Sequence, residues 1–264
     1  MNELLTVAIH AALEAGSRIM EIYDNEDFEV EFKGDNSPLT KADLASHKII
    51  IAHLKATNIH VLSEEGKNIP YEERKRWSQL WIVDPIDGTK EFIKKNGEFT
   101  VNIALVENQV PVLGVIYVPA IKELYYAGKN IGSYKVEDII EFSSFDNIHD
   151  RAQKLPLSIN RNFYTVVASK SHLSPETQEY IQSLEQKHGQ IDIISKGSSL
   201  KLCMVAEGLA DCYPRFAPTM EWDTAAGQAI CLYAGKTVID YKTDKAMLYN
   251  RESLLNNWFL VQEE

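Results

Sequence analysis

The first 23 residues carry apolar side chains at intervals of three and four, which predicts an amphipathic helix. The repeating positions are Leu4, Ala8, Ala11, Ala15, Ile19 and Ile22. Glu3 stands where an export signal would carry basic residues, and His10 and Glu14 interrupt the apolar run. We therefore expect a helix of the folded protein. No stretch approaches the roughly 18 apolar residues that a membrane span needs.

Strand patterns follow this helix. Phe28, Val30 and Phe32 alternate with charged residues, as in a half-buried strand, and a second helix is expected from about Thr40 to Lys55. Four longer segments rich in β-branched and aromatic residues are predicted strands: HVLSEEG, WIVDPIDG, GEFTVNIALVE and VPVLGVIYVP. The middle of the chain therefore predicts a sheet joined by short turns.

The second half alternates strands with helices, which predicts an α/β layer. Strands are expected at FYTVVAS, IDIIS, ADCYP, near Val238 and at 258–261, with helices at 175–188, 198–207 and 223–234. Residues 137–154 are polar and weakly periodic, and are expected to be a peripheral excursion or linker. We predict an N-terminal α+β lobe over 1–158 and a C-terminal α/β lobe over 159–264.

Composition and charge narrow the function. Hydrophobic residues at 45% and charged residues at 25% of 264 positions match an ordinary globular protein. A net charge of −11 argues against a nucleic-acid-binding protein, although an acidic protein can bind an anion through metal ions. The odd, widely spaced cysteines Cys203, Cys212 and Cys231 indicate neither a disulfide framework nor a zinc ribbon, and predict a reducing cytoplasm.

The segment WIVDPIDGTKEF runs a predicted strand into two aspartates, Asp84 and Asp87. Pro85 favours an extended Asp84, and Gly88 tolerates a positive φ, so a tight loop after the strand could direct both carboxylates to one point. A cation site needs this convergence. The same residues are common turn formers, and Thr89 is equally consistent with the N-cap of a short helix. Both interpretations stay open at this stage.

Three further acidic segments accompany this motif. Glu64 and Glu65 end a predicted strand, and adjacent strand residues point in opposite directions, so one of them is expected to face the site. Asp223 opens a predicted helix and Asp43 lies in the first turn of another, where both also fit capping or helix-dipole roles. An all-oxygen set of ligands favours hard cations, and Mg²⁺ where the chemistry involves phosphate. Together they predict a carboxylate-lined, two-metal centre.

In combination these segments resemble the lithium-sensitive, magnesium-dependent phosphatases related to inositol monophosphatase. The family pattern is an upstream Asp, Glu-Glu, Asp-Pro-x-Asp-Gly-Thr and Trp-Asp-x-x-Ala, which corresponds here to Asp43, Glu64-Glu65, 84–89 and 222–226. The resemblance spans nearly the whole chain. Within the family the chain looks most like the bacterial 3′(2′),5′-bisphosphate nucleotidases, through segments such as GSSLKLCMVAEG, YPRFAPT and EWDTAAG.

The resemblance implies a layered αβαβα sugar-phosphatase sandwich, with an antiparallel-rich N-terminal sheet and a smaller C-terminal α/β sheet. It implies two or three Mg²⁺ ions, with Asp84 bridging two of them, and these ligands: Glu64, Asp84, the Ile86 carbonyl, Asp87 and Asp223. The catalytic group it implies is Glu64, Asp43 and Thr89. In this group Thr89, hydrogen-bonded to Asp43, would orient and help deprotonate the attacking water.

The substrate-binding set implied by the resemblance overlaps the metal ligands. It comprises Glu64, Ile86, Asp87, Gly88, Thr89, Ser198, Ser199, Arg215 and Asp223. Ser198 is equally consistent with a helix N-cap, and Arg215 with a solvated surface residue. The histidines show no ligand pattern, so His172 and the others are expected to be structural.

The implied reaction removes the 3′-phosphate of adenosine 3′,5′-bisphosphate to give AMP and phosphate, with a role in sulfate assimilation. Two alternatives stay open: a phosphatase of inositol phosphates or fructose 1,6-bisphosphate on the same fold, and a non-catalytic Mg²⁺-binding module. We expect a small nucleotide as the partner, no nucleic acid and no membrane span. The protein is expected to be a monomer or homodimer in the cytoplasm, either free or peripheral on the inner face of the membrane.

Overall fold

The computed structural model describes residues 1–25, 30–32, 38–168 and 174–263. Its helices are α1 (Asn2–Tyr23), α2 (Lys41–Lys55), α3 (Tyr71–Arg74), α4 (Thr89–Ile93), α5 (Phe145–Asp150), α6 (Pro175–His188), α7 (Leu200–Glu207) and α8 (Glu221–Tyr233). Its strands are β1 (Glu31–Phe32), β2 (Pro38–Leu39), β3 (His60–Ser63), β4 (Gln79–Asp87), β5 (Thr100–Glu107), β6 (Val110–Val118), β7 (Glu123–Gly128), β8 (Gly132–Val136), β9 (Gln153–Lys154), β10 (Tyr164–Ala168), β11 (Ile191–Ser195), β12 (Cys212–Arg215), β13 (Lys236–Asp240), β14 (Lys245–Ala246) and β15 (Phe259–Glu263).

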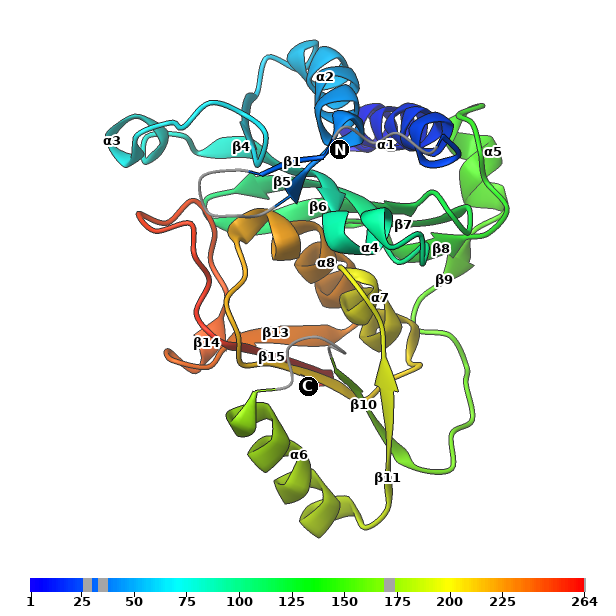
Figure 1. The fold of residues 1–264 in the computed structure, drawn as a ribbon, viewed down its shortest axis with the longest axis vertical. Helices are drawn as coiled ribbons and strands as arrows, with labels where there is room; N and C mark the ends of the chain where they lie inside the picture. The colour runs from blue at the N-terminus through cyan, green and yellow to red at the C-terminus, as the bar shows by residue number, and fades with distance from the viewer. Residues whose placement is uncertain (26–29, 33–37, 169–173, 264) are drawn as a thin grey trace.

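These elements stack into five layers (Figure 1). α1 and α2 cover one face of a seven-stranded sheet, and α7 and α8 lie between this sheet and a six-stranded one. α6 packs on the far side of the second sheet, against β11 and β12. The predicted αβαβα arrangement is confirmed. Within the described ranges, no helix combines the length and the apolar character needed to cross a bilayer.

The two sheets differ in how their strands run. The seven-stranded sheet has the order β3-β4-β5-β6-β7-β8-β9; its β3–β4 pair is parallel and the later pairs are antiparallel. The six-stranded sheet, β11-β10-β12-β15-β13-β14, has parallel pairs around β10 and antiparallel pairs around β15. Asn108 and Gln109 have positive φ angles of 49° and 69° and form the short turn between β5 and β6. Such two-residue turns join antiparallel neighbours.

α1 packs its small apolar stripe against α2 and the first sheet. Ala8, Ala11, Ala15 and Ile19 are fully buried, as the periodicity predicts, whereas Leu4 is half-buried. The helix contacts β5 and β6 through this face. Burial of this stripe stabilises the packing of α1 on the sheet by about 25 cal/mol per Å² of apolar surface removed from water, and the helix forms the outer layer.

α8 approaches the first sheet closely because its buried face consists of small residues. Ala225, Ala226 and Ala229 are buried, and a Cβ added to Gly114 of β6 would lie 2.4 Å from the Ala226 carbonyl oxygen. Only glycine fits at that point of β6. The close approach brings α8 into contact with β4, and so places the first turn of α8, which carries Asp223, beside β4.

The expectation for residues 137–154 is wrong in part. They contain α5, whose Ile148 is buried in the core, and β9, which pairs with β8 at the edge of the first sheet. The predicted elements also omit β7 and β8. β7 is buried along Leu124–Gly128, so it lacks the polar alternation of a half-buried strand. Phe28, which we expected in a strand, lies outside the described residues.

Candidate active site

An irregularity in the pairing of β4 with β5 brings Asp84 and Asp87 together. Asp84 pairs with Asn102 and Asp87 with Thr100, so three steps along β4 match two along β5. Side chains alternate along a strand, so a spacing of three would point the two carboxylates to opposite faces. The extra residue in β4 returns the two side chains to the same face of the sheet. The expectation that the strand ends before a loop at Asp84 is wrong, because pairing continues to Asp87.

Asp84 is the buried member of a group of carboxylates whose other members, Glu64, Asp87 and Asp223, are half-buried. It is 1% exposed, and burial raises its pKa well above the usual range, with further rises from the charges of Glu64, Asp87 and Asp223. Burial also raises the pKa of Asp223 to about 8, and the Asp87 charge adds to that rise. Negative charge concentrated on a buried carboxylate and its half-buried neighbours is unfavourable without a compensating cation. Together with the Ile86 carbonyl, the carboxylates offer an all-oxygen set that fits a hard divalent ion.

The two glutamates after β3 act on different groups. The Glu64 N–H donates to the Val83 carbonyl at 3.1 Å, which holds Glu64 beside β4. Its charge raises the pKa of Asp84, after burial. Glu65 instead adds to the effect of burial on the pKa of Asp43. Of the two, Glu64 lines a cavity beside Asp87 and Glu65 does not, as expected, but strand alternation is not the reason, because the chain turns after Ser63.

Thr89 is the first residue of α4 and not its cap. Gly88 is the N-cap, with φ +94°, so the alternative N-cap role for Thr89 is wrong. The Thr89 Oγ1 lies 3.1 Å from Asp43 Oδ1 and 3.3 Å from the Ile86 carbonyl oxygen. Asp43 Oδ2 accepts from the Thr40 N–H at 2.8 Å and from the Thr40 hydroxyl at 2.5 Å. The Thr89–Asp43 hydrogen bond expected from the sequence is therefore present.

Ser199 connects the second half of the chain to the carboxylates. Its Oγ lies 2.7 Å from Asp87 Oδ2 and 2.8 Å from the Asp223 carbonyl oxygen, and it accepts from the Asn102 amide at 2.9 Å. The Thr100 hydroxyl donates to the side-chain oxygen Oδ1 of Asn102 at 2.8 Å. Sequence analysis did not single out Thr100 or Asn102. The available signal was a polar residue inside the otherwise apolar β5.

Asp223 is the third residue of α8, since the helix begins at Glu221. Its Oδ2 accepts from the Met220 N–H at 2.8 Å. The N-cap interpretation of Asp223 is therefore wrong, although the carboxylate still satisfies a donor at the start of the helix.

A cavity of about 140 Å³ opens beside Asp87 and Asp223, and two cationic side chains line it. Lys201 is 6% exposed, and its ammonium group donates to the Ser198 carbonyl at 2.6 Å. Burial lowers the pKa of Lys201 to about 8, although the charge of Asp87 acts to raise it. Arg215 is half-buried in the same wall. Two cations beside a carboxylate group suit an anionic substrate that also meets metal ions. Lys201 was not predicted.

A second cavity of about 360 Å³ adjoins the first and shares Asp87, Gly88, Arg215 and Asp223 with it. It reaches Glu64 and Thr89. Arg215 is half-buried and lines both cavities, which favours a place at the site over the solvated-surface interpretation. The N-cap interpretation of Ser198 is wrong as well: Ser198 has φ +44° and precedes the N-cap Ser199.

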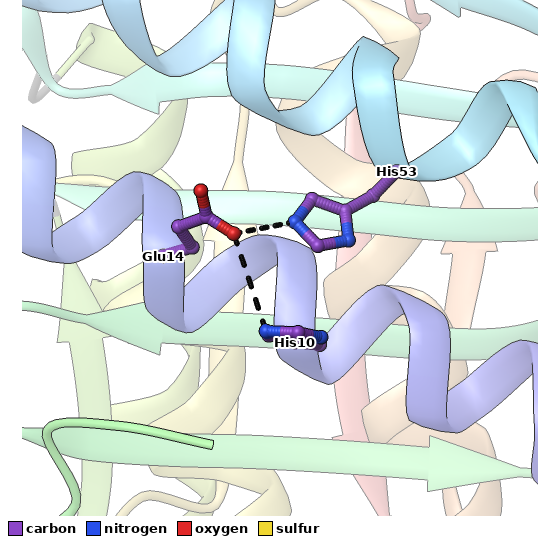
Figure 2. Close-up of side chains that lie close together, drawn as sticks. All are labelled: His10, Glu14 and His53. Atoms are coloured by element: carbon purple, nitrogen blue, oxygen red, sulfur yellow. Dashed lines mark hydrogen bonds and ion pairs between the residues drawn. The ribbon is translucent and has the colours of Figure 1, made fainter.

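Two histidines contradict the expectation that the histidines form no ligand pattern. α1 and α2 bring His10 and His53 together with Glu14 (Figure 2), and one ligand atom of each lies within 4.8 Å of the others. Glu14 and His53 are 39 positions apart, so spacing along the sequence does not reveal the cluster. His172 lies outside the described residues.

Comparison with known proteins agrees with this geometry. The pattern of the inositol monophosphatase family matches residues 1–263. The chain belongs to this family. It is 45% identical to the 3′(2′),5′-bisphosphate nucleotidase CysQ of Salmonella typhimurium over 261 residues, which covers 98% of this chain and 99% of that protein. CysQ of Escherichia coli strain K12 is 43% identical with the same coverage.

A solved structure resembles the chain over its whole length. The crystal structure of CysQ from Bacteroides thetaiotaomicron, described as a bacterial member of the inositol monophosphatase family, is 52% identical, with a TM-score of 0.93 and coverage of 100% of this chain and 98% of that one. The family consists of metal-dependent phosphatases. The predicted family, the fold and the phosphatase class are confirmed.

Proposed function

We propose that this protein is a Mg²⁺-dependent 3′(2′),5′-bisphosphate nucleotidase, which removes the 3′-phosphate of adenosine 3′,5′-bisphosphate to give AMP and phosphate. The observation that carries the proposal is the convergence of the carboxylate group on Asp84 beside the Thr89–Asp43 hydrogen bond. The names of the CysQ relatives support the choice of substrate. By the same likeness we propose a role in sulfate assimilation.

The metal ligands we propose are Glu64, Asp84, the Ile86 carbonyl, Asp87 and Asp223. When bound there, Mg²⁺ ions supply positive charge to the phosphoryl oxygens and lower the pKa of nearby water. The chain's own part is to hold these oxygens fixed. Asp87 is held by Ser199, and Asp223 by the Met220 N–H.

Thr89 orients the attacking water in this proposal. Its hydroxyl donates to Asp43, which leaves its oxygen free to accept a proton from water. Asp43 is held by the two hydrogen bonds from Thr40 and accepts the proton that the Thr89 hydroxyl gives up. As the water oxygen bonds to phosphorus, its proton passes to the Thr89 oxygen and the Thr89 proton passes to Asp43. The bond from phosphorus to the 3′-oxygen breaks, and the 3′-oxygen takes up a proton from solvent. Positioned proton transfer of this kind typically contributes about 10²–10⁴-fold.

Substrate phosphate contacts are proposed for the cations and hydroxyl groups of the smaller cavity. Lys201, Arg215, Ser198 and Ser199 line it next to Asp87. Charge-assisted hydrogen bonds to a phosphate stabilise binding more than neutral ones do. Gly88 is proposed to let the Thr89 backbone approach the phosphate closely, because its αL conformation requires glycine.

The decisive experiment measures phosphate release from adenosine 3′,5′-bisphosphate, inositol 1-phosphate and fructose 1,6-bisphosphate, each with and without Mg²⁺. We expect the nucleotide to have the highest kcat/KM, and turnover to require Mg²⁺. Faster turnover of either competitor would contradict the substrate. Binding of Mg²⁺ without turnover of any of the three would favour a non-catalytic module.

Thr89→Ala tests the role of the hydroxyl. We expect kcat to fall about 10²–10⁴-fold, because the proton acceptor is lost, while Mg²⁺ affinity measured by calorimetry stays unchanged. Thr6→Ala is the control, since the Thr6 hydroxyl donates to the Asn2 carbonyl in the first turn of α1, on an element outside the site. An active Thr89→Ala variant would refute the assignment. The number of ions, the oligomeric state, the cytoplasmic location and the lobe boundaries at 1–158 and 159–264 stay predictions.

A further inference from the structure

The cluster of His10, Glu14 and His53 lies outside the carboxylate site and combines two elements of the outer layer. His10 and Glu14 are one turn apart on α1 and therefore share a face. His53 lies in the last turn of α2, which packs against α1. Figure 2 shows both imidazole rings directed toward the Glu14 carboxylate. One nitrogen or oxygen of each residue lies within 4.8 Å of the other two.

An ordinary hydrogen bond accounts for only part of this arrangement. His53 Nε2 lies 2.6 Å from Glu14 Oε2, a normal hydrogen-bond distance. His10 Nε2 lies 4.0 Å from the same oxygen, too far for a hydrogen bond. The two imidazole rings are only 4.6 Å apart between centroids. If both rings were protonated they would repel each other; burial and the His53 charge lower the pKa of His10. A neutral His10 ring has a nitrogen lone pair available.

The spacing suits a transition-metal ion. Zn²⁺ binds histidine nitrogen and carboxylate oxygen at about 2.0–2.2 Å, so two ligand atoms of a tetrahedral site lie roughly 3.4 Å apart. The observed contacts of 2.6 Å and 4.0 Å bracket this value, so each needs to change by less than about 1 Å. The three side chains are 22–53% exposed and have room to move. Stacking on Phe142, at 4.7 Å between centroids, already holds the His10 ring.

We propose that His10, Glu14 and His53 bind one divalent transition-metal ion of the Zn²⁺ class, which joins α1 to α2, with water in the remaining position. Two nitrogens and one oxygen select such an ion over Mg²⁺, which takes oxygen ligands. On binding, the metal takes the place of the Nε2 proton of His53: a protonated ring releases that proton to solvent, and a neutral ring carries its one proton on Nδ1 instead. The site is independent of the proposed phosphatase reaction, because it shares no residue with the carboxylate group.

The experiment counts Zn²⁺ ions in the whole chain while saturating Mg²⁺ is present. A chromogenic chelator measures Zn²⁺ affinity and stoichiometry for the wild type and for His10→Gln, Glu14→Gln, His53→Gln and His60→Gln. His60 is the matched control, because it is exposed and stacks on Trp77 away from the cluster. We expect the wild type and His60→Gln to bind one ion more than the three cluster variants, or to bind it at least tenfold more tightly. Equal stoichiometry and affinity in all five proteins would overturn the proposal and leave only a hydrogen-bonded pair.

A second measurement on the wild type does not depend on any variant folding. Histidine side-chain nitrogens are followed by NMR as Zn²⁺ is added at constant Mg²⁺. We expect the Nε2 signals of His10 and His53, assigned through the backbone resonances of the wild type, to shift together with one stoichiometric equivalent, while His60 stays unchanged. Zn²⁺ that shifts neither ring, or that binds only where Mg²⁺ competes, would place the ion at the carboxylate site and refute the proposal.

Discussion

Gly114 of β6 lies directly against α8, and Gly114→Ala perturbs the site without touching any of its residues. The new methyl group would meet the Ala226 carbonyl oxygen at 2.4 Å and Ala229 Cβ at 2.8 Å. Ordinary contact begins at 3.4 Å, so α8 must retreat by about 1 Å. Asp223 lies one turn before Ala226 on the same helix and would move with it. Displacements of about 1 Å in a positioned group cost on the order of 10²-fold in rate.

The assay compares phosphate release and thermal unfolding for Gly114→Ala and for Gly128→Ala. We expect Gly114→Ala to lower kcat by about 10²-fold and the free energy of unfolding by about 1–3 kcal/mol. For Gly128→Ala we expect little change, because its Cβ would meet only the flexible end of Ile131, at 2.9 Å. A Gly114→Ala protein that loses stability but keeps full kcat would refute the reasoning, since α8 would then not set the position of Asp223.

Three further outcomes follow from the structure. Lys201→Met should raise KM for the nucleotide about 10-fold or more, since one charge-assisted hydrogen bond to the substrate is lost. Lys196→Met, at an exposed lysine of the segment before α7, should leave KM unchanged; equal KM values in the two variants would remove Lys201 from the substrate site. Mg²⁺ at 100 times its Kd should raise the free energy of unfolding, measured by calorimetry, by about 2.7 kcal/mol. Asp84→Asn should abolish most of this stabilisation by Mg²⁺. An unchanged stabilisation in Asp84→Asn would contradict Asp84 as a metal ligand. Burial acts to raise the pKa of Asp211, but hydrogen bonds from Arg161 and the Thr165 N–H outweigh it and lower the pKa, so the stabilisation from Asp211 is present above about pH 4 and is lost as the pH falls through the lower folded value. Asp211→Asn should therefore lower the free energy of unfolding by about 2 kcal/mol at pH 7, measured in urea, and the difference from wild type should shrink below about pH 4. A difference that does not depend on pH would contradict the ion pair.

Periodicity predicted the elements whose two faces differ. α1, α2 and α6 each bury one stripe, so the pattern of three and four is visible in the sequence. β7 is buried along most of its length and β9 is two exposed residues long, so neither shows alternation. β9 is a strand because it pairs with β8, and such pairing is a tertiary interaction that the sequence of β9 alone does not show.

The acidic residues of the site were predictable because the chemistry restricts them to carboxylates at strand and helix ends. Their neighbours were not. A lysine in a helix usually lies in solvent, so nothing in the sequence marked Lys201 as buried. The bulge that aligns Asp84 with Asp87 depends on the register with β5, and a shift of one residue in that register would separate the two carboxylates.

Alignment of the first sheet with α7 and α8 depends on the hydroxyl of Ser199. Ser199 has one proton, and its oxygen lies within hydrogen-bond distance of both the Asp87 carboxylate and the Asp223 carbonyl. Because Asn102 donates to the same oxygen, the Ser199 proton is directed away from Asn102 and toward these acceptors. Two strands of the first sheet, β4 and β5, therefore meet the starts of α7 and α8 at one atom. The distance between Asp87 and Asp223 is thus set by neutral side chains, which lack the acidic signature that makes the ligands themselves recognisable.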